Sequence, residues 1–290
     1  MPLSGPARAS KHSPAPMDNP SLLDILQLEQ IEQDIYRAQL VLAEQYSLYG
    51  GQVAAQALLA AGLTVSRERL PHSLHGYFLR AGDPQRPTVF QVFRDRDGGS
   101  FSARRVIAIQ GGEVILNMSA SFHRAEPGPL EQAEPMPAAG RPQDAPVFGF
   151  PRLLSFEGRR PEQPFAGVDW PTRFWARVTV PLPPSELLHA CALTYLSDIS
   201  TGVLPSADRS VLPGASLDHS VWFHGPADMN DWTLTDFHPQ VAGRGRGWYT
   251  GSIFGPDGTL VASLAQETLF RARRRAPRPN WGDHQPAAAT

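Results

Sequence analysis

Three polar residues in the second half of the chain have the types and surroundings that hydrolytic chemistry needs. Gln266 lies within an alternating apolar stripe, Ser216 begins the segment Ser-Leu-Asp-His-Ser, and Asp198 ends a helical pattern. A carboxylate, a hydroxyl and an amide can together hold one water with a lone pair directed at a carbonyl, and the carboxylate could take its proton. Taken singly, each residue also has a structural interpretation. Asp198 could cap a loop, Ser216 could satisfy a strand end, and Gln266 could pack at a sheet edge.

Two helical segments, and a series of segments in which apolar and polar residues alternate, have to position these three residues. Residues 51–62 form an Ala-rich helical pattern ended by Gly62, which predicts a buried central helix around which a sheet can curl closely. A second helix is predicted over residues 185–195. Strands are predicted over residues 72–79, 88–93, 101–109 and 113–122 in the first half, and over 174–180, 215–223, 247–254 and 259–271 in the second. A sheet wrapped around a helix is thus predicted twice.

The two halves align as copies of one unit. Three corresponding pairs give offsets of 144, 146 and 135 residues: His75 with His219, Val114 with Leu260, and Ala55 with Ala190. Offsets that change only at loops are typical of a duplicated supersecondary unit. On this alignment Gln266 lies opposite Ala120, Ser216 opposite His72, and Asp198 opposite the neighbourhood of Gly62 and Leu63. A glutamine amide inside an apolar stripe must find hydrogen-bond partners, so the second copy is expected to carry the functional groups.

The rest of the chain divides around these two copies. We predict a disordered tail over residues 1–18, a first repeat over 19–124, a crossover linker over 125–168, a second repeat over 169–272 and a flexible tail over 273–290. Within the first repeat, Asn19 as an N-cap and the apolar stripe that follows it predict an opening amphipathic helix that runs to about Gln33.

Charge and cysteine content narrow the class of protein. The chain has 290 residues and a formal net charge of −2, so no overall field favours nucleic acid or an anionic membrane. The single cysteine, Cys191, excludes an internal disulfide framework and a cysteine-based zinc site. No stretch has the apolar length of a signal-peptide core or a membrane helix. The sequence therefore predicts a cytoplasmic protein.

Four motifs in a fixed order resemble the acyl-CoA thioesterase II family. They are Tyr49-Gly-Gly-Gln-Val-Ala-Ala-Gln-Ala-Leu, His72-Ser-Leu-His-Gly-Tyr-Phe-Leu-Arg-Ala-Gly-Asp83, Gly99-Ser-Phe-Ser-Ala-Arg-Arg-Val106 and Ala215-Ser-Leu-Asp-His-Ser-Val-Trp-Phe-His224. The resemblance runs from about residue 20 to 272 and implies an α+β double hotdog, with two helix-wrapped-by-sheet repeats fused in one chain. It further implies hydrolysis of acyl-CoA thioesters of medium to long chain length to free fatty acid and coenzyme A, with no metal and no cofactor.

Residue roles follow from the same resemblance. In that family an Asp, a Thr or Ser, and a Gln orient the nucleophilic water, and these positions fall on Asp198, Ser216 and Gln266. The chain has serine where the bacterial archetype has threonine. Loss of the methyl group leaves the hydroxyl freer to rotate, so activity is expected while rate and acyl preference are open.

Two further pairs of residues are candidates for substrate binding. Gly51 and Gln52 begin a helix whose free N–H groups and positive dipole end could stabilise a thioester oxyanion, the alternative being a helix start that uses glycine only for a tight turn. Arg104 and Arg105 could meet the phosphates of coenzyme A, the alternative being a solvated strand face.

Two other functions stay open. An enoyl-thioester hydratase would need a histidine paired with an acidic residue at the first helix, which has neither. A catalytically silent acyl-CoA-binding protein could keep the fold, although all three polar positions are occupied here. Hotdog sheets commonly join at their edges, so a homo-oligomer is expected. Nucleic acid is not expected as a partner, because the basic run at residues 271–275 has no aromatic platform beside it.

Overall fold

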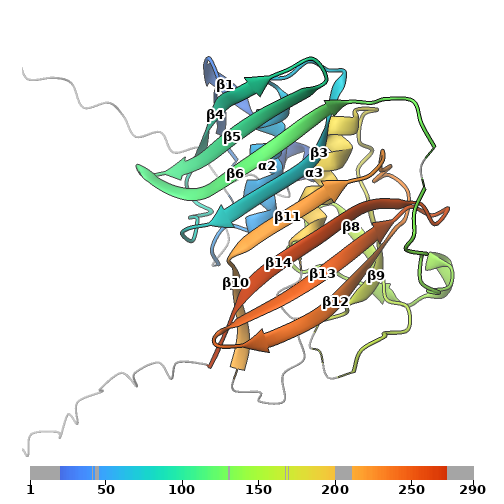
Figure 1. Cartoon of the computed structure of the whole chain (residues 1–290). Coiled ribbons are helices and arrows are strands. Elements are labelled where there is room, and N and C mark those ends of the chain that lie inside the picture. The colour runs from blue at the N-terminus through green and yellow to red at the C-terminus, as the bar shows by residue number, and fades with distance from the viewer. Residues whose placement is uncertain are drawn as a thin grey trace, which may run out of the picture.

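In the part of the chain that the structure describes, fourteen strands form one sheet that wraps around two long helices (Figure 1). This computed structural model describes residues 20–40, 42, 46–129, 131–166, 168, 170–199 and 211–272. The tails predicted over residues 1–18 and 273–290 lie outside these described residues. No helix within them has both the length and the apolar character needed to cross a membrane.

The first repeat follows the predicted order of elements. Helix α2 (Gly50–Gly62) is buried from its second residue to its end, because its alanines allow the sheet to approach closely. The predicted strands are β3 (Arg69–Phe78), β4 (Thr88–Asp97), β5 (Phe101–Gln110) and β6 (Glu113–Arg124). In β6, Leu116, Met118 and Ala120 are buried against the helix while their neighbours are more exposed, which confirms the predicted period of two.

The opening helix is much shorter than predicted. Helix α1 (Leu22–Ile25) begins with a capping box between Ser21 and Asp24, and a hairpin of β1 (Glu29–Glu32) and β2 (Ile35–Ala38) replaces the rest. The prediction of a helix to Gln33 was therefore wrong. Strand β2 pairs with β4, and these backbone hydrogen bonds to a distant strand outweigh the local helical pattern. Asp34, with φ of 58°, makes the tight turn between the two strands.

The second repeat contains the predicted helix and strands, together with β12, which was not predicted, and β10, of which the predicted strand over residues 215–223 covers only the end. The elements are β9 (Arg173–Val178), α3 (Glu186–Ser197), β10 (Val211–Ser216), β11 (Asp218–Phe223), β12 (Thr233–Gly243), β13 (Arg246–Phe254) and β14 (Leu260–Ala272). The first five residues of β12 are all buried, because Met136 and Ala139 of the crossover cover its outer face around Leu234. Burial of both faces removes the alternating pattern, which explains why β12 was missed.

The crossover also extends the sheet. It forms a single 3-10 turn, η1 (Pro142–Asp144), and two short strands, β7 (Val147–Phe148) and β8 (Phe156–Arg159). Strand β8 pairs with β9, so these strands complete the outer edge of the second repeat. Their shortness left no periodicity to detect. The domain boundaries drawn from the sequence stay predictions.

The two repeats join through the pair β3–β11 at the centre of the sheet, with α2 packed beside α3 (Figure 1). Strand pairing gives the true alignment of the repeats. Gly76 pairs with Met118 in the first repeat, and Val221 pairs with Leu264 in the second. If Met118 of β6 corresponds to Leu264 of β14, at an offset of 146 residues, then their pairing partners Gly76 and Val221 correspond to each other. The offset between β3 and β11 is therefore 145 residues, not the predicted 144.

This one-residue correction changes which residues correspond. A shift of one residue along a strand exchanges its two faces, and His75 is exposed whereas His219 is buried. Because Pro71 pairs with Phe122 and Ser216 pairs with Thr268, the counterpart of Ser216 is Pro71, and the predicted counterpart, His72, was wrong. The other two counterparts are confirmed. Ala120 and Gln266 both face inward, and Leu63 and Asp198 are the C-caps of α2 and α3.

Candidate active site

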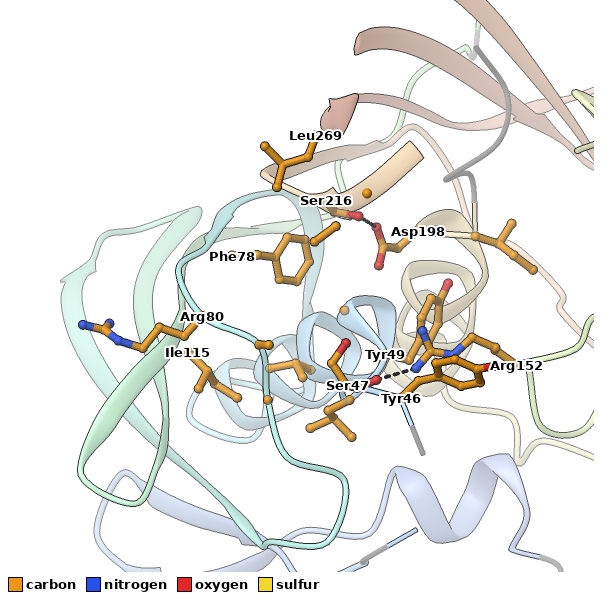
Figure 2. A pocket seen from close by; sticks show the side chains of 18 of the residues that line it. Tyr46, Ser47, Tyr49, Phe78, Arg80, Ile115, Arg152, Asp198, Ser216 and Leu269 are labelled. Atoms are coloured by element: carbon orange, nitrogen blue, oxygen red, sulfur yellow. Dashed lines mark hydrogen bonds between the residues drawn. The ribbon is translucent and has the colours of Figure 1, made fainter. Parts of the chain in front are cut away.

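The three predicted polar residues meet at one point between α3, β10 and β14. The Oγ of Ser216 donates to Oδ1 of Asp198 at 2.7 Å, as Figure 2 shows. The Nε2 of Gln266 donates to the same Oδ1 at 2.8 Å and to the Ser216 Oγ at 2.7 Å. The predicted proximity of the trio is therefore a feature of the fold, while the catalytic roles stay predictions.

An irregularity between β10 and β11 directs Ser216 towards the helix end. The pairing of β10 with β14 shifts register between Pro213 and Ser216, and Leu217 separates the two strands. The Leu217 N–H still reaches the Glu267 carbonyl at 2.8 Å, and Asp218 accepts from the Glu267 N–H at 2.7 Å. These bonds hold the break in place, as expected of a bulge that redirects a side chain.

Asp198 is a buried carboxylate with an unusual set of neighbours. Its exposed fraction is 3%, and burial raises its pKa because the charged form loses hydration. The electrostatic interaction with the His219 ring and hydrogen bonds from Ser216, Gln266 and the Gly51 backbone N–H oppose that shift without cancelling it. A carboxylate with a raised pKa is a stronger base than an ordinary aspartate.

Glycines at the start of α2 allow its N-terminus to touch the end of α3. A Cβ at Gly50 would lie 2.6 Å from Asp198 Oδ2, and one at Gly51 would lie 2.7 Å from the Tyr195 carbonyl oxygen. The Gly51 N–H is directed at the Asp198 carboxylate, whereas the sequence had assigned it to the substrate. Gly50 lines the adjoining pocket, while Gly51 and Gln52 are buried and do not.

A pocket of about 580 Å³ opens beside this junction (Figure 2). Its polar end carries Asp198, Ser216 and Gly50. Its apolar walls include Val53, Phe78, Ile115, Trp170, Ile199 and Leu269. Gln266 does not line the pocket and is fully buried, so it supports Asp198 and Ser216 from behind. A polar end with long apolar walls suits a ligand whose reacting group ends a hydrocarbon chain.

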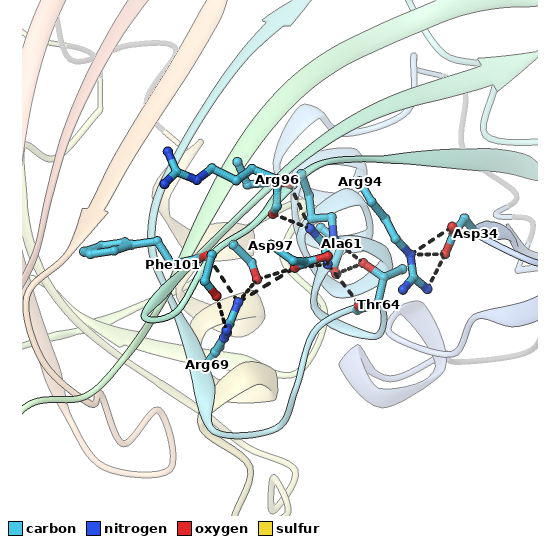
Figure 3. A network of polar contacts seen from close by, with 12 residues as sticks. Asp34, Ala61, Thr64, Arg69, Arg94, Arg96, Asp97 and Phe101 are labelled. Atoms are coloured by element: carbon cyan, nitrogen blue, oxygen red, sulfur yellow. Dashed lines mark hydrogen bonds and ion pairs between the residues drawn. The ribbon is translucent and has the colours of Figure 1, made fainter.

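The structure contradicts the prediction for Arg104. Its side chain is 1% exposed, and its guanidinium binds the Thr64 hydroxyl and carbonyl, the Asp97 carboxylate and backbone carbonyls. Figure 3 shows this network around Thr64, Asp97 and Arg69. Every guanidinium nitrogen is engaged inside the first repeat, so Arg104 has a structural role. The expected alternative of a solvated face was wrong for it too.

Arg105 lies on the outer face of the sheet, away from the pocket. It stacks on Phe93 at 4.1 Å and lies 3.6 Å from Asp95. Two other arginines line the pocket, Arg80 and Arg152. Sequence analysis did not single out either one. Arg80 belongs to the motif that starts at His72, which could have identified it, whereas Arg152 lies in the crossover and had no such signal.

Sequence comparisons match both halves of the chain to acyl-CoA thioesterases. A family model described as the acyl-CoA thioesterase N-terminal domain matches residues 42–123, and one described as the C-terminal domain matches residues 130–270. Acyl-CoA thioesterase 2 of Haemophilus influenzae is 35% identical over 278 residues, covering 87% of this chain and 97% of that protein.

Solved structures give the same result. The acyl-CoA thioesterase II TesB2 from Mycobacterium marinum is 40% identical, with a TM-score of 0.73 over 88% of this chain and 99% of that chain. A protein of unknown function with a hot dog fold from Alicyclobacillus acidocaldarius, 18% identical, has a TM-score of 0.70 over 87% of this chain and 98% of that chain. The predicted double hotdog fold is therefore confirmed. With both halves matched by the family models, the chain belongs to the acyl-CoA thioesterase II family.

Proposed function

We propose that the protein hydrolyses acyl-CoA thioesters to free acid and coenzyme A at the pocket beside Asp198. The observation that carries this proposal is the Ser216–Asp198 hydrogen bond at the polar end of an apolar pocket. Oδ1 of Asp198 already accepts from two side chains, whereas Oδ2 lies beside the pocket-lining Gly50. We therefore propose that Oδ2 accepts the proton of the attacking water.

The reaction needs no covalent acyl-enzyme. The water oxygen, held by Asp198 and the Ser216 hydroxyl, bonds to the thioester carbonyl carbon as its proton passes to Oδ2. The carbon–sulfur bond then breaks, and the coenzyme A thiolate leaves with a proton returned from the carboxyl group. Gln266 takes part by fixing Asp198 and Ser216, since it bonds both. The raised pKa of Asp198 favours its action as a base near neutral pH.

The first turn of α2 supplies the stabilisation of the oxyanion in this proposal. Its N–H groups are unpaired within the helix, and the positive end of the helix dipole points towards the carbonyl oxygen. Gly50 lines the pocket, so its N–H is the candidate donor, whereas Gln52, which does not line the pocket, is a weaker candidate. Gly51 acts differently, because it supports Asp198.

Arg80 and Arg152 replace Arg104 as the residues proposed to bind the coenzyme A phosphates. Figure 2 shows Arg152 beside Tyr46 and Tyr49, and its guanidinium lies 6.0 and 5.6 Å from their ring centroids. Arg80 points outward on the other side of the pocket and is half-exposed beside Glu113. Guanidinium groups bind phosphate in bidentate geometry. Arg105 stays a weaker candidate at greater distance from the pocket.

Release of free thiol from a series of acyl-CoA esters tests the activity. The series runs from short to long saturated chains and includes an enoyl-CoA. The apolar walls support a preference for medium to long chains. Thiol release identifies a thioesterase, hydration of the enoyl ester without thiol release identifies a hydratase, and tight binding with neither product identifies a silent binding protein. Either of the last two results contradicts the proposal.

We also propose that the enzyme works in the cytoplasm as a homo-oligomer. The exposed aromatic rings of Tyr77 and Trp222 on the outer face of the sheet support self-association. The free Cys191 is buried and unpaired by a disulfide, which suits a reducing compartment. Light scattering after size-exclusion chromatography measures the assembly, and a mass of one chain contradicts this part of the proposal.

A further inference from the structure

His219 lies directly behind the proposed site and is not part of the pocket. Its exposed fraction is 1%, and its Nε2 lies 2.7 Å from the Ser197 Oγ. Its Nδ1 has no hydrogen-bond partner among the described residues, and the same is true of Gln266 Oε1. Two buried polar atoms without partners, on neighbouring side chains, are costly unless they serve each other.

Strand register brings these two side chains together. Val221 pairs with Leu264 and Ser220 with Ala265, so the next step along the two antiparallel strands brings His219 opposite Gln266. Gln266 also raises the pKa of His219, which indicates that the two side chains lie close together even though no hydrogen bond of full geometry joins them. The ring and the amide therefore form one buried unit.

Counting protons decides how this unit is arranged. Burial lowers the pKa of His219 and outweighs the opposing effect of the Asp198 charge, so the ring is neutral and carries one N–H. The Ser197 hydroxyl has one proton, which can go to the Thr194 carbonyl at 2.9 Å or to His219 Nε2. In the first case Nε2 must carry the ring proton, and Nδ1 then meets Gln266 Oε1 lone pair to lone pair. In the second case Nδ1–H can donate to Oε1, which satisfies both buried atoms, while the Thr194 carbonyl gives up the Ser197 proton.

We propose that His219 is a positioning residue, whose Nδ1–H donates to Gln266 Oε1 and so directs the Gln266 amide nitrogen at Asp198 and Ser216. This role rests on the proposed hydrolysis. A donor behind the amide adds to the preference that the Asp198 carboxylate already imposes, because it holds Oε1 on the side away from Asp198. With the amide turned over, Oε1 would face Asp198 Oδ1 and repel it.

The first repeat supplies an independent argument. At the corrected offset, His219 corresponds to Leu74 and Gln266 corresponds to Ala120, and Leu74 pairs directly with Ala120. All four side chains are buried. The fold is therefore satisfied by an apolar pair at this place, and the second repeat has exchanged both members for polar groups. A buried polar pair that the fold does not need points to a role in the site.

The tautomer of His219 can be measured in the unaltered protein. The chain has nine histidines, and 15N labelling of their rings with NMR gives a separate signature for each tautomer. The His219 signal is identified by its absence from His219→Asn. We expect a protonated Nδ1 and an unprotonated Nε2 at neutral pH. The opposite tautomer, or a doubly protonated ring, overturns the proposal.

Two variants then separate positioning from packing. His219→Asn places an amide N–H where Nδ1 was, while His219→Gln reaches the Nε2 position towards Ser197 and leaves Gln266 Oε1 without a donor. We expect His219→Gln to lower kcat about tenfold with little change in KM, and His219→Asn to keep most of the wild-type kcat. Equal kcat in the two variants, whether high or low, contradicts the proposal.

A double variant links the effect to Gln266. In a Gln266→Ala background, His219→Gln should cause almost no additional loss of kcat, because the group that it positions is gone. An additional tenfold loss would show that His219 acts by another route. Thermal unfolding of each variant checks that it is folded. Failure of wild-type thiol release would reject the proposed function itself, whereas the tautomer and the Asn–Gln difference test this inference alone.

Discussion

The two repeats use the same backbone for opposite purposes. At four corresponding places the first repeat has Leu63, Pro71, Leu74 and Ala120, and the second has Asp198, Ser216, His219 and Gln266. Pro71, Leu74 and Ala120 show that buried apolar residues satisfy the hotdog unit at the strand positions, whereas Leu63 is exposed at the end of α2. The second set adds buried polar groups that stability alone does not explain. The difference between the repeats therefore marks the site more sharply than either repeat does alone.

The helix junctions differ in the same way. Where α2 begins beside the end of α3, Gly50 leaves space for the Asp198 carboxylate and the pocket. Where α3 begins beside the end of α2, the Leu187 side chain packs against the backbone of α2, and a Cβ at Gly62 would lie 2.5 Å from its Cδ2. The open junction takes its helix start from the first repeat and its carboxylate from the second. Because the two fused repeats differ, this pair of helix junctions has one candidate active site, at the junction of Gly50 with Asp198.

Removing the carboxylate should have the largest effect. We expect Asp198→Asn to lower kcat by about 10²–10⁴-fold, because the proposed base is lost while the shape of the side chain is kept. Thiol release from a well-used acyl-CoA measures the loss. The matched control is Asp95→Asn, an exposed aspartate on the first repeat that lies away from the pocket, which should leave kcat unchanged. Full activity in Asp198→Asn rejects the assignment.

Two glycine substitutions compare the helix junction that contains Gly50 and Asp198 with the one that contains Gly62 and Leu187. Gly50→Ala places a methyl group against Asp198 Oδ2 and should lower kcat by about 10²-fold by displacing the carboxylate. Gly62→Ala instead meets the flexible Leu187 side chain and should cost about 1–3 kcal/mol of unfolding free energy with kcat close to wild type. Kinetics and denaturant unfolding measure both. Similar kinetic losses in the two variants would show that the junctions do not differ in function.

Replacing Gln266 of β14 by alanine, the residue at the corresponding position of the first repeat, should give an intermediate loss of kcat. Gln266→Ala removes two hydrogen bonds, one of them to the Asp198 carboxylate, and should lower kcat by about 10-fold to 100-fold. Thr268→Val is the control, since Thr268 is buried on the same face and its hydroxyl has no partner among the described residues. It should change kcat little. Equal losses would assign the effect to strand packing.

The smallest effect concerns pH. Because folding raises the pKa of Asp198, the stability contributed by its neutral form is complete below the unfolded pKa, about 3.9, and is lost as pH rises through the folded pKa. Asp198→Asn should therefore have a higher Tm than wild type at neutral pH, and the difference should shrink in acid. The acid limb of the wild-type kcat profile should have its midpoint above that of an ordinary aspartate. A Tm difference independent of pH would contradict the raised pKa.

Particular residues show how far prediction could go. Periodicity predicted α2, α3 and most strands, because an alternating or helical stripe follows from burial of one face. It failed at residues 26–33, where pairing of β2 with β4 overrode a helical pattern, and at β12, where both faces are buried. The trio was predicted because each residue differs from its counterpart in the first repeat and matches a position of the acyl-CoA thioesterase II family. Arg104 was misplaced because nothing in the sequence states which distant groups surround a guanidinium.

The sequence by itself determined the duplicated helix-and-sheet unit and the unequal polar positions of the second repeat, since both follow from local spacing. Its four motifs indicated the family, and the resemblance to that family implied the hotdog fold. Only the tertiary structure decided which side chains meet. The register of β3 with β11 and the bulge at Leu217 set the faces on which Ser216 and His219 lie. The close approach of Gly50 to Asp198 depends on how two helices far apart in the chain pack together. These relations join elements across many residues, and a one-residue slip in any strand would have separated them.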